Sequence, residues 1–351
     1  MAHGNGKPTA GRRRSRRATS VDVARLAGVS QSAVSRCFTP GASISERTRS
    51  KILAAAERLG YAPNAIARSL ISGRSRIVGV VLPNITNLFY PEVLHELSQR
   101  LQSAGLRVLL FTVPYGRQID DVMPDVLQYQ VDGIIASARC SPAVAANCQR
   151  RGVPIVFYNR EYPDLPGSSV KCNQAAGAAR LAELLVASGH RRFGMIAGPD
   201  NSPTARDRER GFVAQLRERG IELSARANGQ FLYDVARAAA RALLGARRRP
   251  DALFCANDTM AFGAMDAARH DLNLSVPDDV SIVGFDDSGP SRWRAYDLTT
   301  VRQPIEAMTA TAVELLVQHL ANASLPVVRR QIDGELVVRS SARAAARAPR
   351  R

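Results

Sequence analysis

Apolar and polar positions divide the chain into a short helical part and a longer part in which strands and helices alternate. Over residues 19–62, apolar residues recur at helical spacing between turn residues, which predicts a small all-α domain. Thr19 stands three residues before Asp22, an arrangement that satisfies free N–H groups at a helix start. Ser45 and Gly60 are placed to begin and end a third helix.

After residue 76, short apolar runs alternate with amphipathic helical stretches. The runs span residues 77–82, 108–113, 133–137, 154–158, 193–197, 252–256 and 281–285. The helical stretches include residues 91–104, 175–188, 208–219, 235–244 and 259–268. Continuous apolar strands separated by helices indicate parallel sheet covered on both faces. A change of character near 160–175 predicts two similar α/β lobes within residues 77–340, with ligands beyond the carboxyl ends of the strands.

Three segments lack both patterns. Residues 1–18 are rich in Gly and Arg and are predicted to form a disordered basic arm, and residues 341–351 a disordered basic tail. Residues 63–76 are predicted to form a hinge and linker, because Pro63 interrupts the helical pattern and a short candidate helix over 64–71 follows.

The net charge of +17 is concentrated at the two ends of the chain. Residues 1–76 carry a net charge of +12 and residues 329–351 one of +5, so that the remainder is neutral. A basic end on a neutral body indicates a polyanion partner such as double-stranded DNA, because phosphate contacts release counterions. For the arginine-rich tail, solvated disorder is the alternative interpretation.

Residues 19–36 have the spacing that two helices crossing at a tight turn require. The small Ala24 permits close approach, Gly28 supplies the turn, and Ser30 caps the second helix, while Val29 and Val34 fill the shared core. These features predict a helix-turn-helix. The alternative is an ordinary helix pair in an α-domain, which the surrounding basic charge disfavours.

A helix-turn-helix reads base edges with the first turns of its second helix, so Gln31 and Ser32 are expected to point into the major groove, with Arg36 one turn on. Gln suits adenine or a phosphate, and Arg suits guanine. Two such reading heads on related half-sites predict a homodimer on a pseudo-palindromic operator. Residues 342–351 contain no leucine heptad that would join dimers into tetramers.

The chain resembles the lactose-repressor (LacI/GalR) family of bacterial transcription regulators. The matching sequence segments are VSR at 34–36, SERTR at 45–49, ILAAA at 52–56, LGYAPN at 59–64 and ARSL at 67–70. The resemblance continues through the ligand-binding body and leaves out only the first 18 and about the last ten residues. One departure is the segment FTPG at 38–41, which replaces the polar, often Asn-containing turn of many members.

The resemblance implies a hinge helix over 64–71 that forms on operator binding and inserts paired leucines into the minor groove, with Leu70 at the matching position. An exposed apolar wedge can unstack a base step and kink the duplex. Otherwise Leu70 belongs to the apolar face of a short helix. The predicted DNA-binding residues are Thr19, Ser30, Gln31, Ser32, Ser35, Arg36, Asn64, Ala67 and Leu70.

The resemblance also implies a periplasmic-binding-protein-like (type I) body with an effector cleft. The loop over 83–91 looks like the family loop that lines this cleft, and Arg208 matches an arginine that clamps the effector. The predicted effector-binding residues are Asn87, Phe89, Tyr90, Asn159, Arg208, Phe231, Asn257 and Asp286. The two aromatics Phe89 and Tyr90 could equally belong to the core, and Asn257 or Asp286 could be a turn or helix-cap residue.

The predicted effector is a sugar or a sugar acid. Arg, Asn and Asp side chains from several strand ends supply donors and acceptors for hydroxyl pairs, and aromatic rings cover apolar faces. Arg208 also suits a carboxylate through a bidentate contact. Neither a cofactor nor a metal is expected.

Other classes of protein fit the sequence less well. The chain has no GxxxxGK, HExxH or GxSxG motif and no metal-ligand spacing among its five histidines, which argues against an enzyme. A transport-type solute binder would need a signal peptide, which the sequence does not show. With no apolar stretch long enough to span a membrane, we expect a cytoplasmic repressor that responds to a small molecule.

Overall fold

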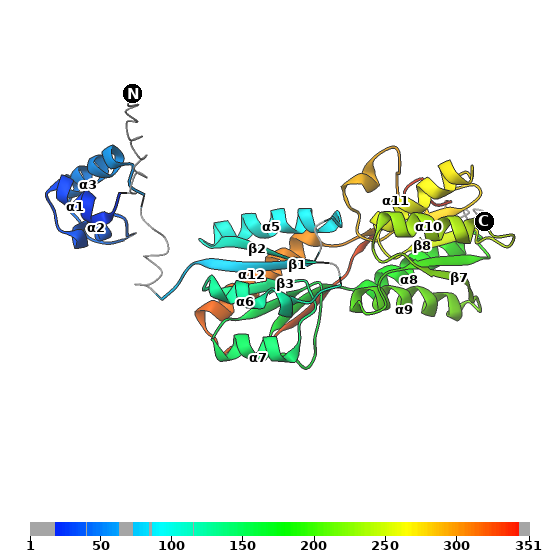
Figure 1. Cartoon of the computed structure of the whole chain (residues 1–351). Coiled ribbons are helices and arrows are strands. Elements are labelled where there is room, and N and C mark those ends of the chain that lie inside the picture. Colours follow the sequence, from blue (N-terminus) through cyan, green and yellow to red (C-terminus); the bar gives the residue numbers. More distant parts are fainter. Residues whose placement is uncertain (1–17, 40, 63–72, 84–85, 115, 344–351) are drawn as a thin grey trace, which may run out of the picture. The chain divides into compact units, whose positions relative to one another are not determined.

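The computed structural model describes residues 18–39, 41–62, 73–83, 86–114 and 116–343, in two compact units divided between Ser75 and Arg76 (Figure 1). Several predictions fall outside the described residues. They are the basic arm up to residue 17, the hinge helix over 64–71 with Asn64, Ala67 and Leu70, and the last eight residues of the tail.

The first unit contains the three predicted helices, α1 (Ser20–Ala27), α2 (Gln31–Cys37) and α3 (Glu46–Leu59). Thr19 and Asp22 form the predicted capping box, in which the Thr19 N–H donates to Asp22 Oδ2 at 2.9 Å. Gly28 ends α1 with φ of 66°, a left-handed conformation that glycine adopts without a steric penalty. Because the turn is this tight, α1, α2 and α3 share one small core around the fully buried Val23, Val34 and Ile52.

The second unit contains twelve strands in its described part. They are β1 (Ile77–Pro83), β2 (Arg107–Val113), β3 (Gly133–Ala136), β4 (Ile155–Tyr158), β5 (Ser168–Cys172), β6 (Phe193–Ala197), β7 (Leu223–Asn228), β8 (Ala252–Cys255), β9 (Ser281–Val283), β10 (Thr300–Arg302), β11 (Arg329–Ile332) and β12 (Glu335–Val337).

The helices of this unit connect and cover those strands. They are α5 (Phe89–Ser103), α6 (Met123–Gln128), α7 (Pro142–Arg150), α8 (Gln174–Ala187), α9 (Pro203–Glu218), α10 (Tyr233–Leu244), α11 (Asp258–Asp266) and α12 (Ile305–Ala321). Short 3₁₀ turns at Ile119–Asp121 and Gly289–Arg292 and a π-helical turn at Ala267–Asp271 complete the described elements.

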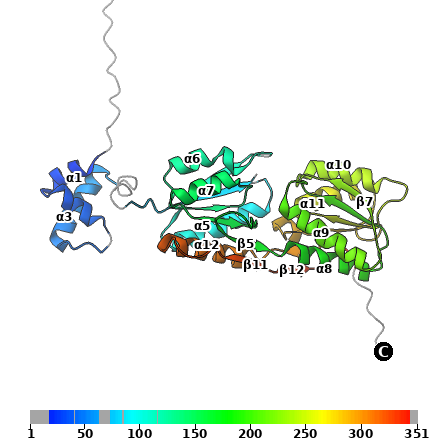
Figure 2. The same cartoon turned by 90° about the horizontal axis from the view of Figure 1, so that it is seen from below.

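Two parallel sheets form the centres of two lobes, as the alternating pattern predicted. The first has the order β11-β5-β4-β3-β1-β2 and the second β7-β6-β8-β9. In the first lobe α5 and α12 cover one face and α6 and α7 the other, and in the second lobe α8 and α9 lie opposite α10 and α11 (Figure 2). The predicted fold class is therefore confirmed, since both faces of each sheet are covered.

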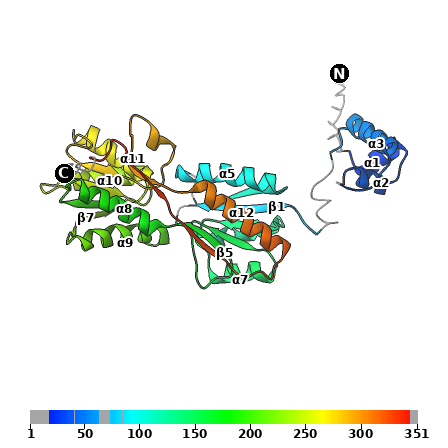
Figure 3. The same ribbon diagram turned by 180° about the vertical axis from the view of Figure 1, so that it is seen from behind.

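The chain passes between the two lobes three times. It leaves the first lobe after β5, returns after β10 to form α12 and β11, and crosses again before β12, which pairs with β10 in an antiparallel ribbon. Figure 3 shows α12 beside the strands of the first lobe although it follows the second lobe in sequence. Residues far apart along the chain therefore meet where these segments cross.

The structure corrects two of the predicted boundaries that bear on the extent of the unit and on Arg208. Ser341 and Ala342, assigned to a disordered tail, are buried, and the Ser341 hydroxyl donates to the Ile282 carbonyl at 2.6 Å, so the ordered unit extends past residue 340. Helix α9 begins at Pro203 rather than 208, because Ser202 caps it through the Ala205 N–H. Arg208 consequently lies inside a helix rather than near its start.

The close approach of α8 and α9 depends on Gly211. A Cβ atom at this position would lie 2.1 Å from the Ala175 carbonyl oxygen. In an open helix a change from Gly to Ala stabilises by about 1 kcal/mol. Here we expect Gly211→Ala to destabilise the unit by about 1–3 kcal/mol, because the two backbones must separate. Urea unfolding measures the difference.

Gly289→Ala is the matched control, because no atom lies within 4 Å of the Cβ that it would add. This variant should unfold like the parent chain. Equal stabilities for the Gly211→Ala variant and the parent would show that the helices are not held at this distance.

Candidate functional site

Helix α2 presents four of the predicted DNA-binding residues on one exposed face. Gln31, Ser32, Ser35 and Arg36 are exposed, whereas Ala33, Val34 and Cys37 on the opposite face are buried in the small core. This separation follows from the helical spacing, since residues three and four apart lie on the same side. The exposed face consists of polar donors and acceptors and one cation, which suits base edges and phosphates.

Thr19 and Ser30, two of the predicted DNA-binding residues, also cap helices α1 and α2. Ser30 Oγ accepts the Ala33 N–H at 3.2 Å and lies 2.9 Å from the Ser32 hydroxyl, and Thr19 caps α1. Gln31 Nε2 donates to Ser20 Oγ at 3.0 Å. These contacts fix the start of α2 while Arg36 extends from its last turn into solvent.

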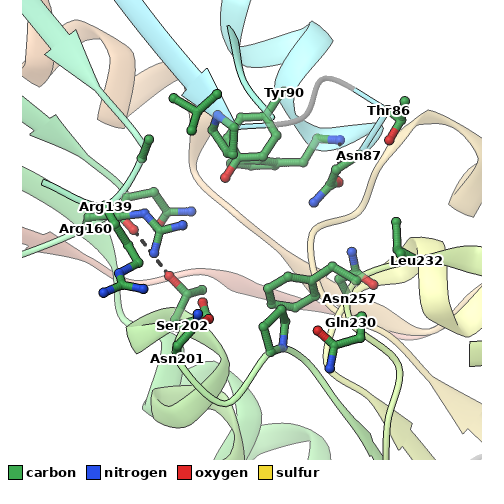
Figure 4. Close-up of a pocket in the computed structure, with 18 of the residues that line it drawn as sticks. Thr86, Asn87, Tyr90, Arg139, Arg160, Asn201, Ser202, Gln230, Leu232 and Asn257 are labelled. Carbon is green, nitrogen blue, oxygen red and sulfur yellow. Dashed lines mark hydrogen bonds between the residues drawn. The ribbon is translucent and has the colours of Figure 1, made fainter. Parts of the chain in front are cut away.

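All eight predicted effector residues line one cavity of about 250 Å³ in the second unit. Figure 4 shows this cavity, with Asn87, Tyr90 and Asn257 labelled among its lining residues. Asn87, Phe89 and Tyr90 come from the loop after β1 and the start of α5, and Asn159 follows β4. Arg208, Phe231, Asn257 and Asp286 come from the second lobe. The cavity therefore has walls from both lobes, at the carboxyl ends of their parallel strands.

Arg208 is almost fully buried and bonded to the protein through each of its three nitrogens. Its Nε donates to Gln174 Oε1 at 2.7 Å, its Nη1 to the Ala256 carbonyl at 2.5 Å and its Nη2 to Asp286 Oδ1 at 2.9 Å. Its guanidinium carbon lies 3.9 Å from the centre of the Phe285 ring. The predicted effector clamp is therefore also a structural group, with most of its geometry fixed by neighbouring side chains.

A chain of side-chain amides extends this pair to the first lobe. Gln303 Nε2 donates to Asp286 Oδ1 at 2.7 Å, and Gln303 Oε1 accepts from Asn159 Nδ2 at 2.9 Å. Asn159 Oδ1 in turn accepts from Gln174 Nε2 at 2.7 Å. Gln174 and Gln303 were not predicted, because an isolated Gln beside a helix start or a strand end carries no sequence signal.

Asp286 has a strained backbone, and Arg208 and Gln303 hold its side chain in place. Its φ of 132° lies in a region that residues with a side chain rarely adopt. Burial raises the pKa of Asp286 to about 7, while Arg208 and Gln303 act in the opposite direction by stabilising the carboxylate. Arg208 and Gln303 therefore stabilise the carboxylate form of Asp286, whose charge is too deeply buried to be solvated by water.

The aromatic residues both line the cavity and belong to the core. Phe89 and Tyr90 are buried in the main hydrophobic cluster, with their ring centres 5.4 Å apart, and they also line the cavity, so that contact with an effector stays a prediction. Phe231 is half-buried and has φ of 60°. Its ring lies where a Cβ on Gly198 would approach within 2.5 Å, so the glycine leaves room for it.

Asn257 is a helix cap and has an unused donor. Its Oδ1 accepts the Met260 N–H at 3.0 Å at the start of α11. Its Nδ2 is buried and has no hydrogen-bond partner among the described residues. Since buried polar groups are nearly always satisfied, this nitrogen is suited to donate to a bound molecule.

The cavity also contains polar residues that the sequence did not single out. They are Thr86, Arg117, Arg139, Arg160, Asn201, Ser202, Thr204, Gln230 and Gln303.

The described part of the chain brings no three His, Cys, Asp or Glu side chains into a group that could hold a metal ion. Within the same part, no helix has the length and apolar character that crossing a membrane requires.

Comparison with known sequences identifies both units. Residues 20–64 match the model for bacterial regulatory proteins of the lacI family, and residues 182–342 match a periplasmic binding protein-like domain. The HTH-type transcriptional repressor CytR of Escherichia coli is 31% identical over 331 residues, which are 93% of this chain and 97% of CytR. The ribose operon repressor of Escherichia coli is 29% identical over 330 residues, 93% of this chain and 100% of its own.

Solved structures agree with the sequence comparison. The Lac repressor dimer bound to operator and the anti-inducer ONPF superposes with a TM-score of 0.84 at 28% identity, covering 94% of this chain and 100% of that one. The complex of the transcriptional regulator CelR with cellobiose gives a TM-score of 0.69 at 29% identity, with coverage of 93% and 100%. The chain belongs to the lacI family of bacterial regulatory proteins.

Proposed function

We propose that this chain is a transcriptional repressor whose affinity for its operator is controlled by a small molecule bound in the cavity between the two lobes. The observation that carries the proposal is the convergence of eight residues, chosen from sequence alone, on one cavity whose walls come from both lobes. The exposed polar face of α2 supplies the DNA-reading surface. Such a switch acts on the chromosome, and hence in the cytoplasm.

The DNA-bound form is proposed to be a homodimer on a pseudo-palindromic operator. The Lac repressor in the similar solved structure is a dimer bound to operator. Two copies of α2 would read two related half-sites, with Gln31, Ser32 and Arg36 toward the base edges and Ser35 on the same exposed face. Asn64, Ala67 and Leu70 remain predicted contacts of the hinge.

Control by ligand requires that the effector bind two arrangements of the lobes unequally. The lobes are joined by three crossing segments, and the hydrogen bonds from Asn159 through Gln303 to Asp286 run between them. A ligand that contacts both walls stabilises one lobe arrangement, and its difference in affinity sets the change in operator binding.

The cavity suits a hydroxylated ligand, a sugar or a sugar acid. Asn87, Asn159 and Asn257 offer amide groups, and Tyr90 and Phe231 offer ring surfaces. The similar regulator CelR was solved as a complex with cellobiose. Thermal-shift screening of sugars and sugar acids against the full chain identifies the effector.

Arg36→Ala tests the reading surface. We expect this variant to lose roughly 1–3 kcal/mol of operator binding and to discriminate less between bases, as happens when a bidentate contact to guanine is removed. Binding is measured by titration of operator and of unrelated DNA at one salt concentration. The control is Arg58→Ala on α3, which also removes an exposed positive charge. Equal losses on operator and unrelated DNA would assign Arg36 to phosphate contacts only.

Asn257→Ser tests the effector site without removing the helix cap. Serine is as good a cap as asparagine, but the change removes the unpartnered amide nitrogen. We expect α11 to keep its stability and effector binding to weaken by roughly 1–3 kcal/mol. The affinity is measured by calorimetry with the molecule found by screening.

Asn173→Ser is the matched control, because Asn173 caps α8 in the same way and does not line the cavity. It should leave effector affinity unchanged. Unchanged affinity in the Asn257→Ser variant would place the ligand elsewhere. Asp286→Ala is a less specific test, since it leaves the buried Arg208 without its partner.

A further inference from the structure

The cavity has more positive charge than its own acidic groups balance. Four arginines line it, Arg117, Arg139, Arg160 and Arg208, against one acidic residue, Asp286. Arg208 is paired with Asp286, and Arg117 lies 3.3 Å from Asp121. The arginines that remain are Arg139 and Arg160.

These two arginines occupy equivalent positions in the loops after two neighbouring strands. Ala136 of β3 pairs with Phe157 of β4, and each arginine comes three residues after its strand residue. The Arg160 Nε donates to the Ser137 carbonyl at 2.6 Å, which holds its guanidinium against the loop that carries Arg139. Figure 4 shows both side chains on the same wall of the cavity.

Neither arginine has an acidic partner among the described residues. Arg160 Nη1 is buried and has no hydrogen-bond acceptor in the same part of the chain. The acid next to it, Glu161, is 2.5 Å from Lys171 Nζ and so is already paired. An unsatisfied buried N–H group is costly, and an acceptor supplied by a ligand would remove that cost.

Three helices also begin at this cavity. The first turn of α5 contributes Phe89 and Tyr90, Ser202 caps α9, and Asn257 caps α11. The free N–H groups and the dipole at a helix start favour negative charge. The donor in excess at Asn257 adds to the same preference for a ligand rich in acceptors.

We propose that the effector is anionic, with a carboxylate or phosphate group bound between Arg139 and Arg160 and its hydroxylated part toward Asn257. Guanidinium groups bind both anions through paired N–H donors. The inference rests on the proposed function, because it takes the cavity to be the effector site. With Arg139 and Arg160 in the site, a neutral sugar is expected to bind more weakly than its acidic or phosphorylated counterpart.

The first test uses inorganic phosphate and the full chain at constant ionic strength. Differential scanning calorimetry follows thermal unfolding of the chain, whose second compact unit contains the cavity. We expect phosphate to raise the midpoint for the parent chain and the double variant Arg139→Gln/Arg160→Gln to lose most of this shift. The control Arg150→Gln/Arg219→Gln removes two exposed charges outside the cavity and should retain the phosphate-induced shift of the midpoint. A shift that is absent from the parent, or retained in the cavity variant, overturns the proposal.

The second test distinguishes the two anions by calorimetry with matched pairs, glucuronate against glucose and ribose 5-phosphate against ribose. We expect the charged member of one pair to bind at least tenfold more tightly, and this preference to disappear in the Arg139→Gln/Arg160→Gln variant. Preference in the first pair assigns a carboxylate and in the second a phosphate. A result in which neither charged sugar binds better than its neutral partner overturns the proposal.

Operator binding in the same samples separates this inference from the proposed function. A neutral sugar that changes operator affinity equally in the parent and the double variant would leave the effector switch intact and refute the anionic ligand. Phosphate binding that depends on Arg139 and Arg160, with operator affinity unchanged by any charged sugar that binds, would support the anion site and refute its role as a switch.

Discussion

The ion pair between Arg208 and Asp286 is the interaction on which the geometry of the cavity depends. Both side chains are nearly inaccessible to solvent, and removing two charges from water costs several kcal/mol for each ion. The cost is offset by the amides of Gln174 and Gln303, by a backbone carbonyl and by the ring of Phe285. Because each partner needs the others, helix α9 and the loop after β9 are fixed relative to each other.

The same network reaches the first lobe through Asn159. Gln303 lies directly after β10, in the segment that returns the chain to the first lobe, and it bonds to both Asn159 and Asp286. A displacement of either lobe therefore has to stretch or exchange hydrogen bonds that are buried, where the loss of a bond is most costly. This gives the cavity a physical connection to the lobe arrangement that the proposed switch would use.

The sequence predicted those parts of the fold that depend on local patterns. The apolar runs predicted β1, β3 and β8 because these strands are buried on both faces, whereas β7 (LSARAN) and β11 (RRQI) are partly exposed and have no such run. In the candidate site, Asn159, Asn257 and Asp286 could be predicted because each follows an apolar run, and Arg208, which lies inside helix α9, through the family resemblance. Arg139 and Arg160 could not, since an arginine in a loop is ordinary and their partnership depends on the register of β3 against β4.

Because the guanidinium of Arg208 is bonded to protein acceptors, other residues of the cavity have to recognise a charged ligand. From sequence, it was the natural site for a carboxylate, but three of its five N–H groups are directed at protein acceptors and its charge is balanced by Asp286. A ligand anion placed there would compete with that carboxylate. Arg139 and Arg160 face no such competitor among the described residues, so the capacity to bind an anion lies on the wall of the first lobe, whereas Arg208 belongs to the second lobe.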